Sequence, residues 1–256
     1  MMRGKVSAGR FPDADVDADA DPDTNADADA ALEADVALCA RELYHFFRAG
    51  EEETLALRGV SLRVRRGETV AVVGPSGAGK STLLSCLAGL DEPSGGEVRV
   101  TGIRISHRPE TERARLRARR IGVLLQTRNL VAHLSVRDNI RLAHSAVRGR
   151  PAASPRDLLD QVGLAERAHA LPRQLSGGEL ARAGLAVALA NTPDVLLADE
   201  PTGELDGTTE RLILQLLRDR AALGCAVLIV THSAQAVRVA DRVITLDDGR
   251  ASDGTA

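Results

Sequence analysis

Aromatic residues and lysine are nearly missing from this chain of 256 residues. It has no Trp, one Tyr and three Phe, and lysine supplies only Lys5 and Lys80 among its 33 basic residues. Because so few are present, the position of each rare side chain is informative.

Long hydrophobic runs and paired cysteines are also absent. The strongest apolar run, 225–230, is far shorter than the roughly 20 residues that span a bilayer. The three cysteines are widely spaced and include no CxxC pair, which indicates buried thiols in a reducing compartment rather than a disulfide framework or a zinc site. The N-terminus lacks the basic and apolar order of a secretory signal. These absences predict a soluble cytosolic protein.

The net charge of −3 averages two different segments. Residues 1–35 carry ten acidic and three basic side chains, a net −7, whereas the remainder carries +4. A body of +4 is too weakly basic to favour nucleic acid, so we expect no nucleic-acid partner.

The acidic segment is predicted to be a low-complexity tail over residues 1–36, with the folded domain at 37–256. Its few apolar groups cannot offset the entropy of ordering it, so we expect disorder. Its reach of about 30–35 Å would let it touch the domain's own basic surface. A solubilising and a regulatory role both stay open.

The folded part alternates strand and helix patterns. Continuous apolar strands at 69–74, 195–200 and 226–232, separated by helical segments, predict a parallel sheet covered on both faces. The other expected elements are strands at 36–47, 55–68, 95–105 and 242–249, helices at 80–90 and 208–222, a solvated basic helix at 110–120, and helical segments within 127–172.

A glycine-rich phosphate loop lies between the strand at 69–74 and the helix at 80–90. GPSGAGKST (74–82) matches G-x-x-x-x-G-K-[ST]. Its glycines let successive N–H groups turn inward, the helix N-terminus adds partial positive charge, Lys80 reaches the β- and γ-phosphates, and Ser81 offers a hydroxyl to Mg²⁺. The expected binding residues are Gly74, Pro75, Ser76, Gly77, Ala78, Gly79, Lys80, Ser81 and Thr82.

Lys80 is the only lysine outside the acidic tail. In a chain that otherwise uses arginine, we interpret lysine at this position as a requirement of the site, because a guanidinium fork would crowd a tight phosphate cradle.

VLLADE (195–200) supplies the second half of the site. Its Asp199 is the candidate to hold Mg²⁺, and Glu200 the candidate to orient or deprotonate the attacking water.

With LSGGE at 175–179 added, the chain resembles the ATP-binding cassette (ABC) family over about residues 40–250. Gln126 at the end of IGVLLQ, Asp206 after LADEPTGEL and His232 at the end of AVLIVTH follow the family's order. The resemblance implies an α/β fold of P-loop NTPase type, with a mixed sheet core, an antiparallel β subdomain and an inserted helical subdomain. It also implies ATP and Mg²⁺ as ligands.

The resemblance further implies a dimer of ATPase subunits, identical or different. ATP would lie between the phosphate loop of one subunit and the LSGGE segment (175–179, the family's signature) of the other. Ser176, Gly177 and Gly178 would contact the γ-phosphate across the interface, where Asp206 also lies. Gln126 would sense Mg²⁺, and His232 would hold the γ-phosphate and the water. The partner would be a membrane permease, which places the chain peripherally on the cytoplasmic face.

All three aromatic positions of the folded part fall within 44–47. The family stacks adenine on an aromatic ring just before the first core strands, and its spacing favours Phe47, with Tyr44 as the alternative.

Two positions depart from the family pattern. Glu179 replaces the commoner Gln of the signature, and Val187 stands where a second Arg is usual, which casts doubt on the efficiency of that helix.

LADEPTGELD and the segment before GVSL look like the macrolide-export and lipoprotein-release group. The leading hypothesis is therefore an ATPase that energises a separate permease. The alternative is a non-transport ABC ATPase that transmits force to a cell-division or cell-wall complex. A role on ribosomes or DNA usually needs two cassettes or a coiled-coil insertion, and one cassette without heptads argues against it.

Overall fold

The computed structural model describes residues 35–49, 52–126, 129–147, 153–203 and 205–254. Nearly all of the predicted acidic tail lies outside the described residues, so its disorder stays a prediction. The first strand begins at Val36. No helix within the described ranges is long and apolar enough to cross a membrane.

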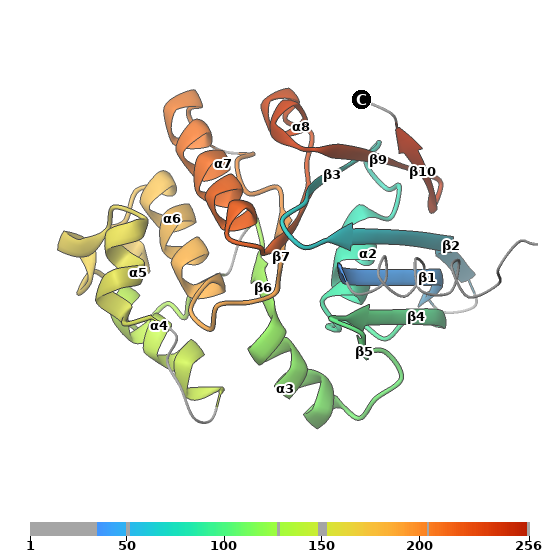
Figure 1. Ribbon diagram of the computed structural model, residues 1–256, viewed down its shortest axis with the longest axis horizontal. Helices are drawn as coiled ribbons and strands as arrows, with labels where there is room; N and C mark the ends of the chain where they lie inside the picture. The colour runs from blue at the N-terminus through green and yellow to red at the C-terminus, as the bar shows by residue number, and fades with distance from the viewer. Residues whose placement is uncertain (1–34, 50–51, 127–128, 148–152, 204, 255–256) are drawn as a thin grey trace, which may run out of the picture.

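A six-stranded sheet lies at the centre of the molecule (Figure 1). Its strands follow the order β10-β9-β3-β8-β7-β6, all parallel except β10, which pairs antiparallel with β9. The strands are β3 (Thr69–Val73), β6 (Ile121–Leu124), β7 (Val195–Asp199), β8 (Ala226–Val230), β9 (Arg242–Asp247) and β10 (Arg250–Gly254).

The central strands are buried on both faces, which explains their continuous apolar sequence. In β7, Val195 and Leu197 join one hydrophobic core, whereas Leu196 and Ala198 join the other. β8 alternates in the same way. The prediction of a parallel sheet covered on both faces is confirmed.

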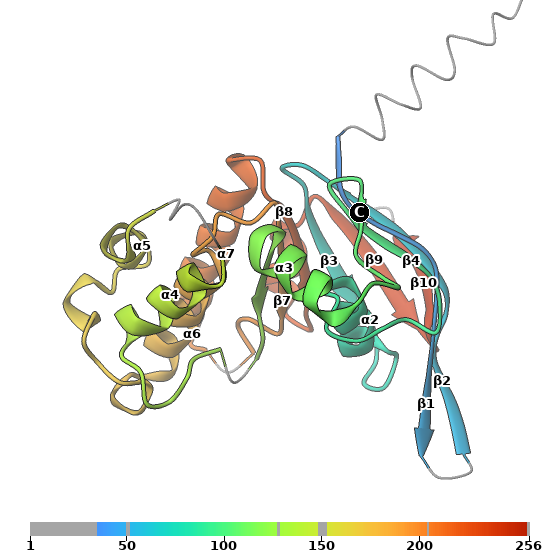
Figure 2. The ribbon, with the colours of Figure 1, turned by 90° about the horizontal axis from the view of Figure 1, so that it is seen from below.

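A four-stranded antiparallel sheet, in the order β2-β1-β4-β5, packs beside the first. Its strands are β1 (Val36–Ala49), β2 (Glu52–Arg65), β4 (Gly95–Val100) and β5 (Ile103–Arg104). The predicted single strand at 95–105 is thus a short hairpin. Leu38, Ala40 and Val98 face the core on one side of this sheet, whereas Cys39 and Arg99 lie on the other side, where Cys39 is also buried. The β1–β2 hairpin reaches beyond the body of the molecule (Figure 2).

Helices cover the core and form a separate layer at the end opposite the antiparallel sheet (Figures 1 and 2). α2 (Lys80–Leu87) packs between the two sheets. α3 (Glu110–Arg120) has no buried residue, as predicted for a solvated helix. The others are α4 (Val136–Ser145), α5 (Pro155–Gln161), η1 (Ala165–Arg167), η2 (Pro172–Gln174), α6 (Gly177–Ala188), α7 (Gly207–Ala222) and α8 (Ala234–Val239). The layer containing α4, α5 and α6 is inserted between β6 and β7, as the resemblance implied.

Candidate nucleotide-binding site

A cleft of about 750 Å³ opens where β3 ends and the loop 74–79 leads into α2. Ligands of open α/β sheets bind at this carboxyl edge. The cleft brings together most of the predicted site residues, which come from segments far apart in the sequence. Those lining it are Phe47, Ser76, Gly77, Gly79, Lys80, Ser81, Thr82, Gln126, Asp199, Glu200 and His232.

Two glycines shape the loop because no side chain fits in their place. Gly74 has φ +154° and Gly79 has φ +99°. A Cβ on Gly74 would lie 2.0 Å from the Leu246 carbonyl oxygen, and one on Gly79 would lie 2.4 Å from the Ala56 carbonyl oxygen. Both positions therefore require glycine for backbone conformation and for space.

Lys80 is the first residue of α2 and is only 8% exposed. Its Nζ donates hydrogen bonds of 2.8 Å to the Gly74 carbonyl and 2.9 Å to the Pro75 carbonyl. No side chain caps the N-terminus of α2 in this described segment. The first N–H groups of a helix lack intrahelical partners, so those of α2 are suited to phosphate oxygens.

Asp199 faces Ser81 at the end of β7. Burial raises the pKa of the Asp199 carboxyl, and the neighbouring charge of Glu200 adds to that shift; a hydrogen bond with Ser81 and the charge of Lys80 oppose it. As the pH rises through this raised pKa, Asp199 ionises and the folded protein loses stability. A bound cation would offset this loss. Oxygen ligands suit Mg²⁺. Asp199, the Ser81 hydroxyl and the Gln126 amide fit that ion.

Glu200 follows with φ 46°, an uncommon backbone conformation for a non-glycine residue. Its N–H donates to the Val230 carbonyl at 2.9 Å, and its Oε2 accepts from the His232 N–H at 3.3 Å. Its Oε1 is buried and has no hydrogen-bond partner among the described residues, and the His232 Nε2 lies 3.5 Å from it. An unpaired carboxylate oxygen inside a cleft is placed to accept a hydrogen bond from water.

The structure separates the two aromatic candidates. The Phe47 ring lines the cleft and meets His45 edge-on, with the ring centroids 4.8 Å apart. Tyr44 does not line it and instead lies over Gly59, where a Cβ would come within 2.9 Å of the Tyr44 hydroxyl. The geometry therefore favours Phe47 for stacking on adenine.

The LSGGE segment lies outside the cleft that holds Lys80. Ser176 is the N-cap of α6, where its Oγ accepts from the Glu179 N–H and the Glu179 carboxylate accepts from the Ser176 N–H. Glu179 also accepts from Arg167 at 3.0 Å. The hydrogen bond from the Ser176 backbone is the largest factor that lowers the pKa of the Glu179 carboxyl, followed by Arg167. An acid at position 179 thus has a charged partner within its own chain.

Asp206 also caps a helix and also lies away from the Lys80 cleft. Its Oδ1 accepts from the Thr208 and Thr209 N–H groups, and its Oδ2 accepts from the Thr209 hydroxyl at 2.7 Å. Thr209 packs against the signature, because a Cβ on Gly178 would lie 2.7 Å from its methyl group. Gly177 has open space at its Cβ position. The predicted signature and Asp206 are therefore coupled to each other, and the chain brings neither to its own phosphate loop.

A family model described as ABC transporter matches residues 57–203. This chain belongs to the ABC transporter family. A solved structure, the dimeric post-hydrolysis state of the ATP-binding cassette MJ0796 bound to ADP and Pi, is 33% identical with a TM-score of 0.79, and covers 86% of this chain and 99% of that one. The predicted P-loop ATPase fold of ABC type is confirmed. ATP binding and hydrolysis are the general activity of such cassettes.

Three relatives show the range of systems around this cassette. MetN, a methionine import ATP-binding protein of Mesorhizobium japonicum, is 46% identical over 203 residues, 77% of this chain and 55% of MetN. YbbA, an uncharacterised ABC transporter ATP-binding protein of Escherichia coli, is 43% identical over 217 residues, which cover 82% of this chain and 95% of YbbA. MacB, a macrolide export ATP-binding/permease protein of Burkholderia pseudomallei, is 43% identical over 208 residues, which cover 80% of this chain and 32% of MacB. The chain thus spans about half of MetN and a third of MacB.

Val187 of the cassette takes part in packing. It lies on α6, packs on the helical core and lines an apolar groove of about 350 Å³. Arg182, one turn earlier in the same helix, donates to the Val162 carbonyl at 3.0 Å and so ties α6 to the end of α5. The presence of valine rather than arginine at position 187 therefore leaves the hydrogen bond between α6 and the end of α5 intact.

Sequence reasoning missed two sets of residues around the cleft. Arg58 lines it and forms an ion pair of 3.1 Å with Asp248. Glu210 accepts hydrogen bonds from Thr202 and Ser233 and so joins the segments that follow Glu200 and His232. Neither set belongs to a recognisable sequence motif. The residues of each set are distant in the sequence, and only the folded structure brings them together.

Replacing Phe47 with Ala is expected to weaken ATP binding by about 5- to 150-fold, because a ring stacked on a base contributes about 1–3 kcal/mol. Binding of inorganic triphosphate, which has no base, should stay within about twofold. Phe46→Ala is the matched control, since Phe46 is similarly exposed but does not line the cleft. Equal losses for ATP and triphosphate, measured by calorimetry, would assign Phe47 a merely structural role.

Proposed function

We propose that this cassette hydrolyses MgATP as a subunit that energises a separate membrane permease of export or lipoprotein-release type. The observation that carries the ATPase part of this proposal is the division of the site. Lys80, Asp199, Glu200 and His232 share one cleft, whereas Ser176 is presented elsewhere on the surface. A second copy or a related cassette would supply its signature to this cleft, and the chain would act at the cytoplasmic face of the membrane.

Each side chain has a distinct task in this mechanism. Lys80 and the first N–H groups of α2 would hold the phosphates, and Phe47 the adenine. Ser81, Asp199 and Gln126 would hold Mg²⁺, which neutralises charge on the phosphate oxygens. Glu200 would accept a proton from the attacking water through its unpaired Oε1, and His232, 3.5 Å from that oxygen, would hold the water and the γ-phosphate in line.

The export assignment is supported by the likeness to MacB. The likeness to MetN favours a second candidate, an import system, because the identity is as high. The ATP site itself does not distinguish the two directions, since the substrate would contact the permease.

Affinity purification of the tagged chain from detergent-solubilised membranes tests this function. We expect a co-purifying multi-span membrane protein that, in reconstituted vesicles, raises the ATPase rate when substrate is added. The Glu200→Gln chain should pull down the same partner without hydrolysis, which excludes a contaminating ATPase. A partner that gives no substrate-stimulated hydrolysis would contradict transport and favour the force-transmitting alternative.

A further inference from the structure

The outer face of the antiparallel sheet carries a row of arginines that the ATP site does not use. Cys39 in β1 pairs with Arg63 in β2 on one side and with Arg99 in β4 on the other, and Arg99 pairs with Arg104 in β5. Three of the four positions across the sheet are therefore arginines on one face. Arg99 and Arg104 lie directly opposite each other, which is unfavourable for like charges in a sheet, and Glu97 pairs with Arg99 at 3.0 Å. An anionic partner would offset the charge of the arginines that Glu97 does not pair with.

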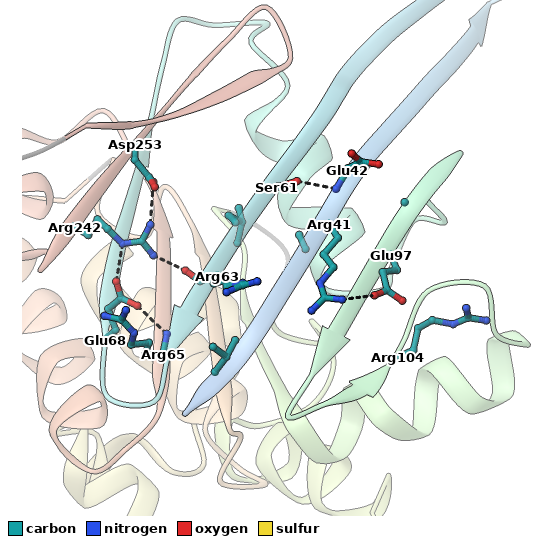
Figure 3. Close-up of a pocket in the computed structure, with 14 residues that line it drawn as sticks. Arg41, Glu42, Ser61, Arg63, Arg65, Glu68, Glu97, Arg104, Arg242 and Asp253 are labelled. Atoms are coloured by element: carbon teal, nitrogen blue, oxygen red, sulfur yellow. Dashed lines mark hydrogen bonds and ion pairs between the residues drawn. The ribbon is translucent and has the colours of Figure 1, made fainter. Parts of the chain in front are cut away.

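A groove of about 1190 Å³ runs along this face toward β9 and β10. Some of its charged side chains are already paired, as Figure 3 shows: Arg242 lies between Glu68 and Asp253, and Arg41 pairs with Glu97. These pairs use three of the four carboxylates that line the groove.

Three further arginines of the groove remain available. Arg63, Arg65 and Arg104 are exposed, and their guanidinium groups form no ion pair or hydrogen bond with any described residue. Glu42, the remaining lining carboxylate, lies at the opposite end of the groove from Arg65 (Figure 3). The groove therefore has a local excess of positive charge near the start of β1.

We propose that the acidic segment 12–35 of the same chain occupies this groove and shields its arginines from other polyanions. The segment has nine Asp, one Glu and no basic residue. Asp occurs at every second position from Asp13 to Asp23, an alternation that an extended backbone would place on one side.

The connection of the segment to the fold supports this occupant. Val36, which directly follows the segment, lines the groove, and the Asp35 carbonyl accepts a hydrogen bond of 2.9 Å from the Arg66 N–H. A flexible 24-residue segment has an r.m.s. length of about 25–30 Å, so attachment at the groove edge gives it a local concentration of order millimolar. Exposed ion pairs are individually weak, but this tethering favours their formation.

Proteolysis of the full-length chain at aspartate tests the proposal. An endoproteinase that cleaves before Asp should cut residues 12–35 at least about fivefold more slowly in the intact protein than in a synthetic peptide of this segment, because cleavage tracks the undocked population. Replacing Arg63, Arg65 and Arg104 with Gln should bring the rate to that of the peptide. The matched control removes three exposed arginines from α7 and α8 by Arg211→Gln, Arg218→Gln and Arg238→Gln, and should keep the protection.

Equal cleavage of the protein and the peptide would overturn the proposal, as would loss of protection in the control. Unchanged protection in the groove variant, together with its loss of binding to phosphatidylglycerol vesicles, would assign the arginines to a membrane instead.

A second variant leaves the folded residues untouched. Replacing the six aspartates at 13, 15, 17, 19, 21 and 23 with Asn should raise the salt concentration needed to elute the chain from heparin. Adding the three groove Arg→Gln changes should abolish that increase. An increase that persists without the groove arginines would contradict shielding of this face.

Discussion

Glu200→Gln is expected to lower the ATP turnover number by about 10²- to 10⁴-fold, the contribution of a positioned general base. The amide keeps the shape of the side chain and can still contact water, but it cannot take up a proton. Because Gln fits the same left-handed backbone position and the N–H bond to Val230 stays, the fold should be unaffected. Phosphate release under saturating MgATP measures the effect.

Asp206→Asn provides a comparison for this variant. Asp206 is also an acid near the end of a core segment, but its carboxylate is used as a helix cap, and Asn caps helices about as well as Asp. We expect its turnover loss to be far smaller than that of Glu200→Gln. Hydrolysis by Glu200→Gln within about threefold of the wild type would remove Glu200 from the role of base.

Lys80→Ala and Lys80→Arg are both expected to weaken ATP binding by more than about 100-fold, through loss of charge-assisted hydrogen bonds of about 1.5–3 kcal/mol each. Arg should not restore binding, because Lys80 is 8% exposed and its ammonium lies within the loop between the Gly74 and Pro75 carbonyls. The planar guanidinium is too broad for that space. Calorimetric titration with MgATP measures the affinity.

Lys5→Arg is the matched control, since Lys5 is the other lysine of the chain and lies in its acidic N-terminal segment. It should bind ATP as the wild type does. If Lys80→Arg kept wild-type affinity, the loop would be wider than the structure indicates, and the requirement for lysine at this position would be wrong.

Much of the core could be predicted from the sequence because its signals are local. The run 195–200 begins with four consecutive apolar residues, so its side chains are apolar on both faces of the strand. A strand with two apolar faces is typical of the centre of a covered parallel sheet. The helix at 110–120 was predicted with the bounds that the structure gives it, since its charges mark a solvated surface. Gly74 and Gly79 of the phosphate loop are required by contacts to Leu246 and Ala56, but their spacing together with Lys80 and Ser81 was sufficient to identify the motif.

What the sequence did not predict depends on register between distant segments. β10 was missed because RASDG is polar and short, and it becomes a strand only by pairing with β9. The ion pair of Arg58 with Asp248 spans residues from β2 and the turn after β9. The arginine row on the antiparallel sheet likewise follows from the pairing of four strands, and no motif marks it.

The structure also gives some predicted residues a role within the chain. Ser176 and Asp206 were assigned to a shared ATP site, and each caps a helix of its own chain. Capping is compatible with that assignment, because the same caps fix the N-termini of α6 and α7 at the surface where a second cassette would contact them. The central claim is therefore that ATP joins two cassettes through Lys80 of one and Ser176 of the other.

Sedimentation velocity of Glu200→Gln with MgATP tests that claim most directly. We predict a stable ATP-dependent dimer, which Ser176→Arg in the same background abolishes while ATP binding by the monomer stays within about threefold. Ser154→Arg, which breaks the equivalent capping box of α5, should leave the dimer intact. A dimer that persists with Ser176→Arg, or ATP binding that is lost with it, would contradict the shared site.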